Sequence, residues 1–314
     1  MNVEVASGSV TSVTAGQFER IYDPSEDEAE RWYVNDHTFV LDHEGTWHLI
    51  GITDTEPPDP HTEIHLAHAT APSLHGPWIK HPHVMSADPE WGETHLWAPH
   101  AIAHDDLYWM FVNGGATSSS PSQRCTPTEY RIHLATSPDC WEWTRHPDNP
   151  LVVDGFEARD PMVLFVGDRW LMYYTATSTP EGGHHIVAAA ESDDLIHWVG
   201  RHVVYEDEMV GTMAGPTESP FVVERDGTYY LFIGPDWQGL VDSFSQTGRY
   251  DPAAYRRTRV LASDDPLSFH IDDQVGLLNA HAAEVIIDET GDTWVSHCGW
   301  GQRGVYLAPL IWDR

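Results

Sequence analysis

The sequence predicts an all-β chain, and two observations lead to this class. Short runs of β-branched and aromatic residues, joined by turns that contain Gly or Asp, follow one another along all 314 residues. A longer phrase made of such runs also recurs five times. Helical periodicity is clear nowhere between these runs, with only a faint pattern in "EDEAERWY".

Each copy of the phrase is expected to form four strands. Its first half, as in "RDPMVLFVGDRWLMYY", is an acid or His, an apolar run, a polar turn and an aromatic strand. Its second half, as in "HIVAAAESDDLIHWVGRH", is a strand, a polar turn and usually a tryptophan strand. The equivalent hairpin aromatics are spaced 61, 62, 59 and 65 residues apart: Trp47, Tyr108, Trp170, Tyr229 and Trp294. Five such repeats predict a single five-bladed β-propeller with four-stranded antiparallel blades, because each blade needs neighbours to cover its faces.

The blades are expected to begin near residues 35, 97, 159, 217 and 281, so that residues 1–314 form one domain. The fifth copy stops early, at "VYLAPLIWDR". We therefore expect a strand within residues 9–20 to complete the fifth blade and close the ring. The segment "GPDWQG", after the fourth hairpin, is expected to be a polar loop.

The charge balance excludes one class of partner. The chain has 49 Asp and Glu against 16 Lys and Arg, a formal net charge of −33, and Lys80 is its only lysine. A surface of this sign repels phosphate backbones, so we expect no nucleic-acid partner. The acids are spread along the chain, which is typical of an acidic folded surface and resembles proteins of salt-in halophiles. A moderately acidic mesophilic protein is the alternative.

The sequence shows no sign of membrane insertion or export. No apolar run approaches the roughly 20 residues that a membrane span needs. The start "MNVEVASGSV" lacks a basic segment followed by an apolar core. We therefore expect a soluble, cytoplasmic protein. The three cysteines are odd in number and lack C-x-x-C spacing, so free buried thiols are expected in place of disulfides or zinc: Cys125, Cys140 and Cys298.

Acidic residues open the first strand of several repeats. Counting back ten or eleven residues from the hairpin aromatics leads to Asp36, Asp160, Glu218 and Glu284. The innermost strand of a propeller blade runs along the central channel, so these positions should converge on an axial funnel. Like charges crowded in one place raise one another's pKa, an arrangement typical of catalytic sites. We predict that this funnel is the active site and that Asp36, Asp160 and Glu218 are catalytic.

Motifs around these acids resemble those of known enzymes. Asn35-Asp36, Arg159-Asp160-Pro161 and Glu218-Ser219-Pro220 are similar to the N-D-P, R-D-P and E-C-P motifs of the invertase and levanase family, glycoside hydrolase family 32, to which levansucrases are related. Trp97-Ala98-Pro99 and His281 are similar to the W-A-P motif and axial histidine of the arabinanase and β-xylosidase family, family 43. The resemblance to these five-bladed propeller hydrolases extends over all five repeats.

The resemblance implies a glycosidase that uses two carboxyl groups. Glu218 would be the general acid, and Asp36 would act on the other side of the anomeric carbon. The R-D-P motif favours Asp36 as the nucleophile of a retaining mechanism, and the alternative is a base that activates water in an inverting one. Asp160 would accept hydrogen bonds from sugar hydroxyls and keep Glu218 protonated. Arg159 would pair with Asp160 or with a sugar hydroxyl.

Further side chains are candidates for contacts to the sugar, and flat rings that stack on sugar faces predominate among them: Arg159, Trp97, His100, His37, His281, Glu284, Trp237 and Trp300. No cofactor is expected. A structural calcium ion at the axis, with His281 as a ligand, is the one metal that the pattern allows, although one His with waters makes a weak site.

The predicted function is hydrolysis of a terminal furanoside, as by a β-fructofuranosidase, with a small oligosaccharide as the partner. The alternatives among enzymes are an inverting α-L-arabinofuranosidase or β-xylosidase, and a transferase that passes the sugar to another sugar. A glycan-binding propeller without catalysis is the alternative from a different class. The sequence predicts neither the linkage nor the oligomeric state.

Overall fold

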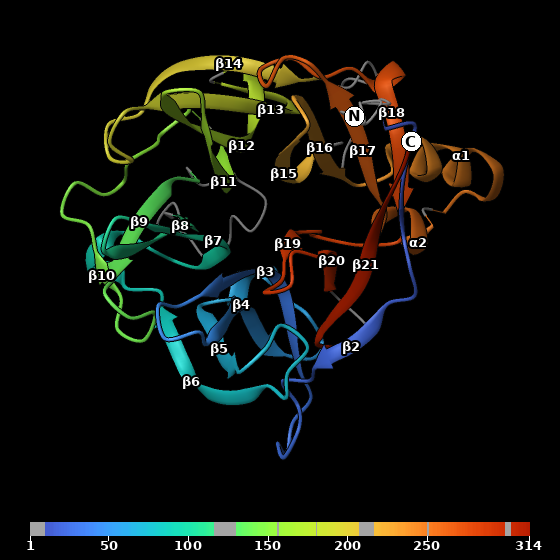
Figure 1. Ribbon diagram of the computed structural model, residues 1–314. Coiled ribbons are helices and arrows are strands. Elements are labelled where there is room, and N and C mark those ends of the chain that lie inside the picture. Colours follow the sequence, from blue (N-terminus) through green and yellow to red (C-terminus); the bar gives the residue numbers. More distant parts are fainter. Residues whose placement is uncertain are drawn as a thin grey trace, which may run out of the picture.

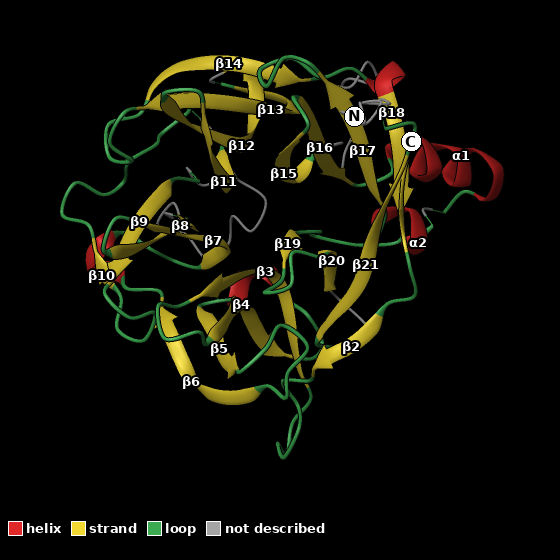
Figure 2. Cartoon of the chain, viewed as in Figure 1, coloured by secondary structure: helices red, strands yellow, loops and turns green. Residues whose placement is uncertain are grey.

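The computed structural model describes residues 10–115, 130–155, 157–179, 181–206, 217–249, 251–298 and 303–314. Within these ranges the chain is almost entirely strand and loop, so the predicted all-β class is confirmed (Figure 2). The faint helical pattern "EDEAERWY" forms turns that lead into a strand. Single 3₁₀ turns occur at three places: Pro60–Thr62, Pro89–Trp91 and Ile271–Asp273. None of the described helices is long and apolar enough to cross a membrane.

Three sheets contain four strands each, paired in chain order and antiparallel. The first consists of β3 (Trp32–Leu41), β4 (Trp47–Thr55), β5 (His65–Ala71) and β6 (Ile79–Ser86). The second consists of β7 (Leu96–His104), β8 (Leu107–Gly114), β9 (Ile132–Ser137) and β10 (Thr144–Arg145). The third consists of β11 (Ala158–Val166), β12 (Arg169–Thr179), β13 (Gly182–Ser192) and β14 (Val199–Tyr205).

The remaining strands form a larger sheet with two parts. Its first part consists of β15 (Glu218–Arg225), β16 (Thr228–Gly234), β17 (Thr258–Ser263) and β18 (Gln274–Leu278). Its second part consists of β19 (Val285–Ile287), β20 (Thr293–Cys298) and β21 (Val305–Asp313). Two strands from the N-terminal end of the chain both pair antiparallel with β21: β1 (Ser12–Ala15) and β2 (Glu19–Tyr22). One parallel pair, between Val13 and Gly276, joins the two parts.

The sheets stand around a common centre, with β3, β7, β11, β15 and β19 nearest to it (Figure 1). Buried apolar clusters lie between neighbouring sheets. Ile50 of β4, for example, belongs to the same cluster as Met110 of β8, whereas the adjacent Leu49 belongs to a cluster with Val305 of β21. Each sheet is therefore apolar on both faces, and its neighbours on the two sides hold the starts of the inner strands near one another.

Two helices lie between β16 and β17, where the sequence predicted only a polar loop, and that prediction was wrong. These are α1 (Trp237–Thr247) and α2 (Pro252–Tyr255). Asp236 caps α1 by accepting a hydrogen bond from the Gly239 amide at 3.2 Å. Trp237 is buried in the small apolar core of this helix pair. The cap residue and the buried ring explain why a segment that is polar on average forms a helix.

Candidate active site

The inner strands share one irregularity near their start. The pairing of each with its neighbour contains one extra residue, a β-bulge. One extra residue is also present just before β19. There the Cys298 amide donates to the His281 carbonyl at 3.3 Å and the Ser296 amide donates to the Glu284 carbonyl at 2.9 Å, so three steps along one segment face two along the other. These four-residue segments, the inner-strand bulges, are residues 34–37, 97–100, 159–162, 218–221 and 281–284. In four of them the second residue has a positive φ, at 44°, 54°, 50° and 47°: Ala98, Asp160, Ser219 and Ala282.

The sequence count implied that the acids occupy equivalent positions, and this was wrong. Glu218 is the first residue of its bulge, Asp160 the second, Asp36 the third and Glu284 the fourth. The count was misaligned for two reasons. It allowed either ten or eleven residues, and the hairpin turns differ in length: five residues separate the last pair between β3 and β4, but two separate the last pair between β11 and β12. Because a bulge re-aims side chains, the acids approach the centre in different directions.

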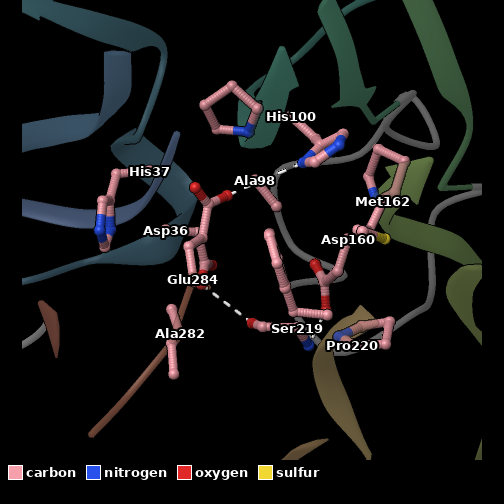
Figure 3. Close-up of a pocket in the computed structure, with 14 residues that line it drawn as sticks. Asp36, His37, Ala98, His100, Asp160, Met162, Ser219, Pro220, Ala282 and Glu284 are labelled. Carbon is pink, nitrogen blue, oxygen red and sulfur yellow. Dashed lines mark hydrogen bonds and ion pairs between the residues drawn. The ribbon is translucent and has the colours of Figure 1, made fainter. Parts of the chain in front are cut away.

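The inner-strand bulges enclose a small pocket (Figure 3). The second, third and fourth residues of four bulges line it, together with the third and fourth residues of the first bulge, Asp36 and His37. Its enclosed space is about 30 Å³, enough for one or two water molecules, and the pocket is open on one side. Backbone strain of the kind found in its wall is concentrated at functional sites in proteins. The pocket therefore brings carboxylates together in a strained part of the inner strands.

Ser219 connects two of the carboxylates. Its hydroxyl donates to Asp36 Oδ1 at 2.9 Å, and its backbone N–H donates to Asp160 Oδ2 at 3.0 Å (Figure 3). Thr175 also donates to Asp160, at 3.2 Å. Burial, with the neighbouring Asp160 charge, raises the pKa of Asp36 well above its ordinary value, and the hydrogen bond from Ser219 opposes this change. Ser219, which stands where the invertase motif has cysteine, thus fixes the positions of Asp36 and Asp160 relative to each other.

Glu218 lies next to this pair. Its Oε2 accepts a hydrogen bond from the Tyr255 hydroxyl at 2.9 Å, and its Oε1 is 3.6 Å from Arg159 Nη2. Burial raises the pKa of Glu218, while Arg159 acts in the opposite direction. A carboxyl group with a raised pKa is suited to donate a proton.

Sequence reasoning missed Tyr255, which reaches Glu218 from α2. One signal could have found the helix that carries it. In "DPAAY" an Asp that can cap a helix precedes a Pro at the first helical position, and Asp251 does accept a hydrogen bond from the Ala253 amide at 2.9 Å. Nothing in the sequence indicates that the tyrosine at the end of this turn contacts an acid on β15.

Arg159 is half-buried among carboxylates. It donates to Asp160 Oδ2 at 2.9 Å, which is the pairing considered from the sequence, and it also contacts Glu157 and Glu218. Burial acts to lower the pKa of Arg159, but Asp160 and Glu157 outweigh it and raise this pKa well above its ordinary value. The guanidinium is therefore a permanent positive charge between the acids.

Two histidines and Glu284 complete the wall of the pocket. His37 Nε2 is 2.8 Å from the Ser296 hydroxyl, and burial lowers the pKa of His37 to about 3, so it is neutral. His100 Nδ1 is 3.9 Å from Glu284 Oε1. Burial raises the pKa of Glu284, and His100 acts against this. These three predicted sugar contacts line the same pocket as Asp36 and Asp160.

His281, the residue considered for a calcium ion, makes other contacts. Its ring lies on Tyr255, with 5.2 Å between the ring centroids, and its backbone N–H donates to His297 Nδ1 at 2.9 Å. Burial lowers the pKa of His281 to about 4. In the part of the chain that the structure describes, no three His, Cys, Asp or Glu side chains are grouped to hold a metal ion.

The predicted tryptophan platforms have different outcomes. Trp97 is half-buried and stacks on His95, with 3.8 Å between the ring centroids, and it does not line the pocket. Trp237 is 1% exposed in the core of the helix pair, so the prediction that it stacks on a sugar was wrong. Its place in "GPDWQG" resembled a loop only because the helix was not anticipated. Trp300 lies outside the described residues.

Replacing Tyr255 with Phe is expected to raise the pKa of Glu218, because the hydroxyl that stabilises its ionised form is removed. The alkaline limb of the pH profile of kcat/KM should then move to higher pH, by about one unit or less. The profile of the variant checks this, with Tyr229→Phe at the far end of β16 as the matched control. An alkaline limb that does not move would show that Tyr255 does not act on Glu218.

The fold and the site together define a class: sheets that surround a centre at which carboxylates meet, as in propeller glycoside hydrolases. The model of glycosyl hydrolases family 43 matches residues 78–307. This chain therefore belongs to glycosyl hydrolases family 43.

Individual relatives come from both groups that the motifs resembled. The chain is 27% identical over 215 residues to a probable sucrose-6-phosphate hydrolase of Psychromonas ingrahamii, a stretch that covers 66% of this chain and 36% of the relative. The chain thus spans about a third of the length of the curated relatives it matches.

Two solved structures show the same fold. A family 32 β-fructofuranosidase of Bombyx mori aligns with a TM-score of 0.63 at 17% identity, covering 89% of this chain and 61% of that one. An α-L-arabinofuranosidase of Lactobacillus brevis aligns with a TM-score of 0.63 at 14% identity, covering 89% and 91%. At these identities the likeness concerns the fold alone.

Proposed function

We propose that this chain is a glycoside hydrolase that releases a terminal furanose, with Glu218 as general acid and Asp36 as its carboxylate partner. One observation carries the proposal: Ser219 joins Asp36 to Asp160, and Arg159 joins Asp160 to Glu218. Three carboxylates are thereby held around one point by two connecting residues. Cleavage of a glycoside needs carboxyl groups on both sides of the anomeric carbon.

The active form requires Glu218 protonated and Asp36 ionised. Glu218 would give its proton to the leaving oxygen, and its raised pKa keeps that proton available to higher pH. Asp36 must lose its own proton to act, so activity would rise with pH through the raised pKa of Asp36. A bell-shaped pH profile follows. Asp160 would accept hydrogen bonds from sugar hydroxyls and oppose ionisation of Glu218.

The substrate group and the role of Asp36 are linked. The Arg159-Asp160-Pro161 segment, the sucrose-6-phosphate hydrolases and the β-fructofuranosidase support a fructoside and a nucleophilic Asp36. The match to family 43 and the arabinofuranosidase support a second candidate, a pentosidase in which Asp36 activates water and the product is inverted.

We also propose that residues 1–314 form one five-bladed propeller with the active site at its axis. The inner-strand bulges and the apolar clusters between neighbouring sheets support five blades. The pairing of β1 and β2 with β21 supports closure by the N-terminal segment. The sugar would bind against the open side of the pocket, with Asp36 and Asp160 in the pocket wall and Glu218 next to Ser219.

Sugar release in molar salt tests the function, because a net charge of −33 needs screening. The substrates form two matched sets, fructosides (sucrose, short inulin and levan oligomers) and pentosides (arabino- and xylo-oligosaccharides), with Asp36→Asn as the blank. We expect the wild type to release fructose from the fructosides and Asp36→Asn to release none. Pentose release would favour the second candidate, and binding without release from either set would contradict hydrolysis.

A further inference from the structure

A further buried carboxylate, outside the pocket, contacts Arg159. Glu157 is 4% exposed and directly precedes β11. Its Oε1 accepts a short hydrogen bond from Arg159 Nε, and its Oε2 is 2.7 Å from His185 Nε2 on β13. Neither Glu157 nor His185 lines the central pocket, and no motif in the sequence pointed to them. They form a chain of contacts that ends at the guanidinium.

The Arg159 guanidinium therefore contacts three carboxylates at different distances. Glu157 holds the Nε edge, and Asp160 holds Nη1 at 2.9 Å. Glu218 is 3.6 Å from Nη2, which is beyond hydrogen-bond distance. The nearer carboxylates of Glu157 and Asp160 thus offset most of the positive charge of Arg159 and weaken its effect on Glu218. A closer Arg159 would favour ionised Glu218 and remove the proton that an acid needs.

We infer that Glu157 and His185 are positioning residues, which hold Arg159 away from Glu218 so that this acid keeps its proton. The inference rests on the proposed function, because it gives Glu218 the role of general acid. The pair acts through Arg159 and has no contact with the reacting atoms.

The charges around the guanidinium support this assignment. Burial acts to raise the pKa of Glu157, but Arg159 and His185 outweigh it and lower this pKa to about 2, so Glu157 is ionised at working pH. The other titratable or charged groups that face Arg159 and Glu218 come from four elements: Asp160 on β11, His185 on β13, Asp36 on β3 and Tyr255 on α2. Glu157 differs from these groups in that it accepts the hydrogen bond from Arg159 Nε, whereas Asp160 accepts from Nη1.

His185 has one strong contact. Its Nε2 is bonded to Glu157, while its Nδ1 is buried and has no hydrogen-bond partner within the described ranges. The hydrogen bond to Glu157 therefore sets the orientation of the ring, and the ring in turn fixes Glu157. Loss of this donor would leave Glu157 free to turn away from Arg159.

The same sheet offers a matched control. Glu191, at the other end of β13, also bridges an arginine and a histidine: it is 2.6 Å from Arg169 Nη1 and 2.9 Å from His202 Nε2. This triad has the same chemistry and is distant in the strand from every acid of the candidate site. A Glu→Gln change there removes an ion pair without touching Arg159.

The test measures the pKa of Glu218 in Glu157→Gln. Infrared titration of the carboxyl band, taken as the difference between each chain and its Glu218→Gln counterpart, gives this pKa without any substrate. We expect it to fall by about one unit, and the alkaline limb of kcat/KM to move to lower pH by the same amount, with KM little changed. Glu191→Gln should change neither.

A second pair of variants tests His185. Both variants remove the imidazole, which itself acts to lower the pKa of Glu218, so they are compared with each other. His185→Gln keeps an amide donor for Glu157, and we expect the pKa of Glu218 to be lower in His185→Leu than in His185→Gln. An unchanged pKa in folded Glu157→Gln overturns the inference. If that variant does not fold, equal pKa values in the two His185 variants overturn it. An infrared shift in a chain that releases no sugar would refute the proposed function and leave the coupling of Glu157 to Glu218 in place.

Discussion

Replacing Asp36 with Asn is expected to lower kcat/KM by about 10⁴-fold or more, as for other carboxylates and hydroxyls that attack substrate directly. An amide can neither attack an anomeric carbon nor accept a proton from water. The Ser219 hydroxyl, which donates to Asp36 at 2.9 Å, can donate to the Asn carbonyl as well, so the site should keep its shape. Steady-state kinetics on any substrate that the wild type cleaves measure the loss.

Asp226→Asn is the control for this change. Asp226 lies in the turn between β15 and β16, exposed and 2.7 Å from Arg314, and its replacement should leave kcat/KM unchanged. A loss of less than tenfold in Asp36→Asn would refute a direct role for Asp36. Proton NMR of the first anomer that the wild type releases separates the two roles, because a nucleophile retains the configuration and a base inverts it.

Replacing Glu218 with Gln is expected to lower kcat/KM by about 10²–10⁴-fold on natural glycosides. The loss should nearly disappear with a dinitrophenyl leaving group, which departs without a proton. In the wild type, activity should fall as the pH rises through the raised pKa of Glu218, since the acid then lacks its proton. The variant should lack this alkaline limb.

Glu224→Gln makes the same chemical change on the same strand, at an exposed position where the carboxylate accepts a hydrogen bond from Gly227 at 2.7 Å. It should behave as the wild type. If Glu218→Gln lowered kcat/KM equally for substrates with good and with poor leaving groups, this would contradict the role of Glu218 as proton donor. A glycan-binding protein would show binding, measured by calorimetry, in both variants and turnover in neither.

Strand content was predictable because each hairpin is a local pattern. Alternating runs and turn residues lie within about 16 residues of one another, and the strands around Trp47 and Trp170 appear where that pattern placed them. The helix pair between β16 and β17 was missed because its signals are single residues. Asp236 caps one helix and Asp251 the other, and the apolar core of the pair is small.

The three acids were identified from their place at the start of inner strands, but not their relation to one another. Hairpin turns of two and five residues shifted the count, so the acids seemed equivalent when they occupy successive bulge positions. Tyr255 and Glu157 had no motif at all. Their importance lies in contacts with Glu218 and Arg159, which are made across elements far apart in the chain.

Four properties could be deduced from the amino-acid sequence: the chain is all-β, it repeats itself, it is strongly acidic, and several of its inner strands begin with acids. These properties depend on neighbouring residues and on composition. The connections that Ser219, Arg159, Tyr255 and Glu157 make between the acids became visible in the folded chain, because the bulges and the packing between sheets set which side chains meet. The pKa of a buried carboxyl group depends on those neighbours and on the water they exclude, and neither is local in sequence.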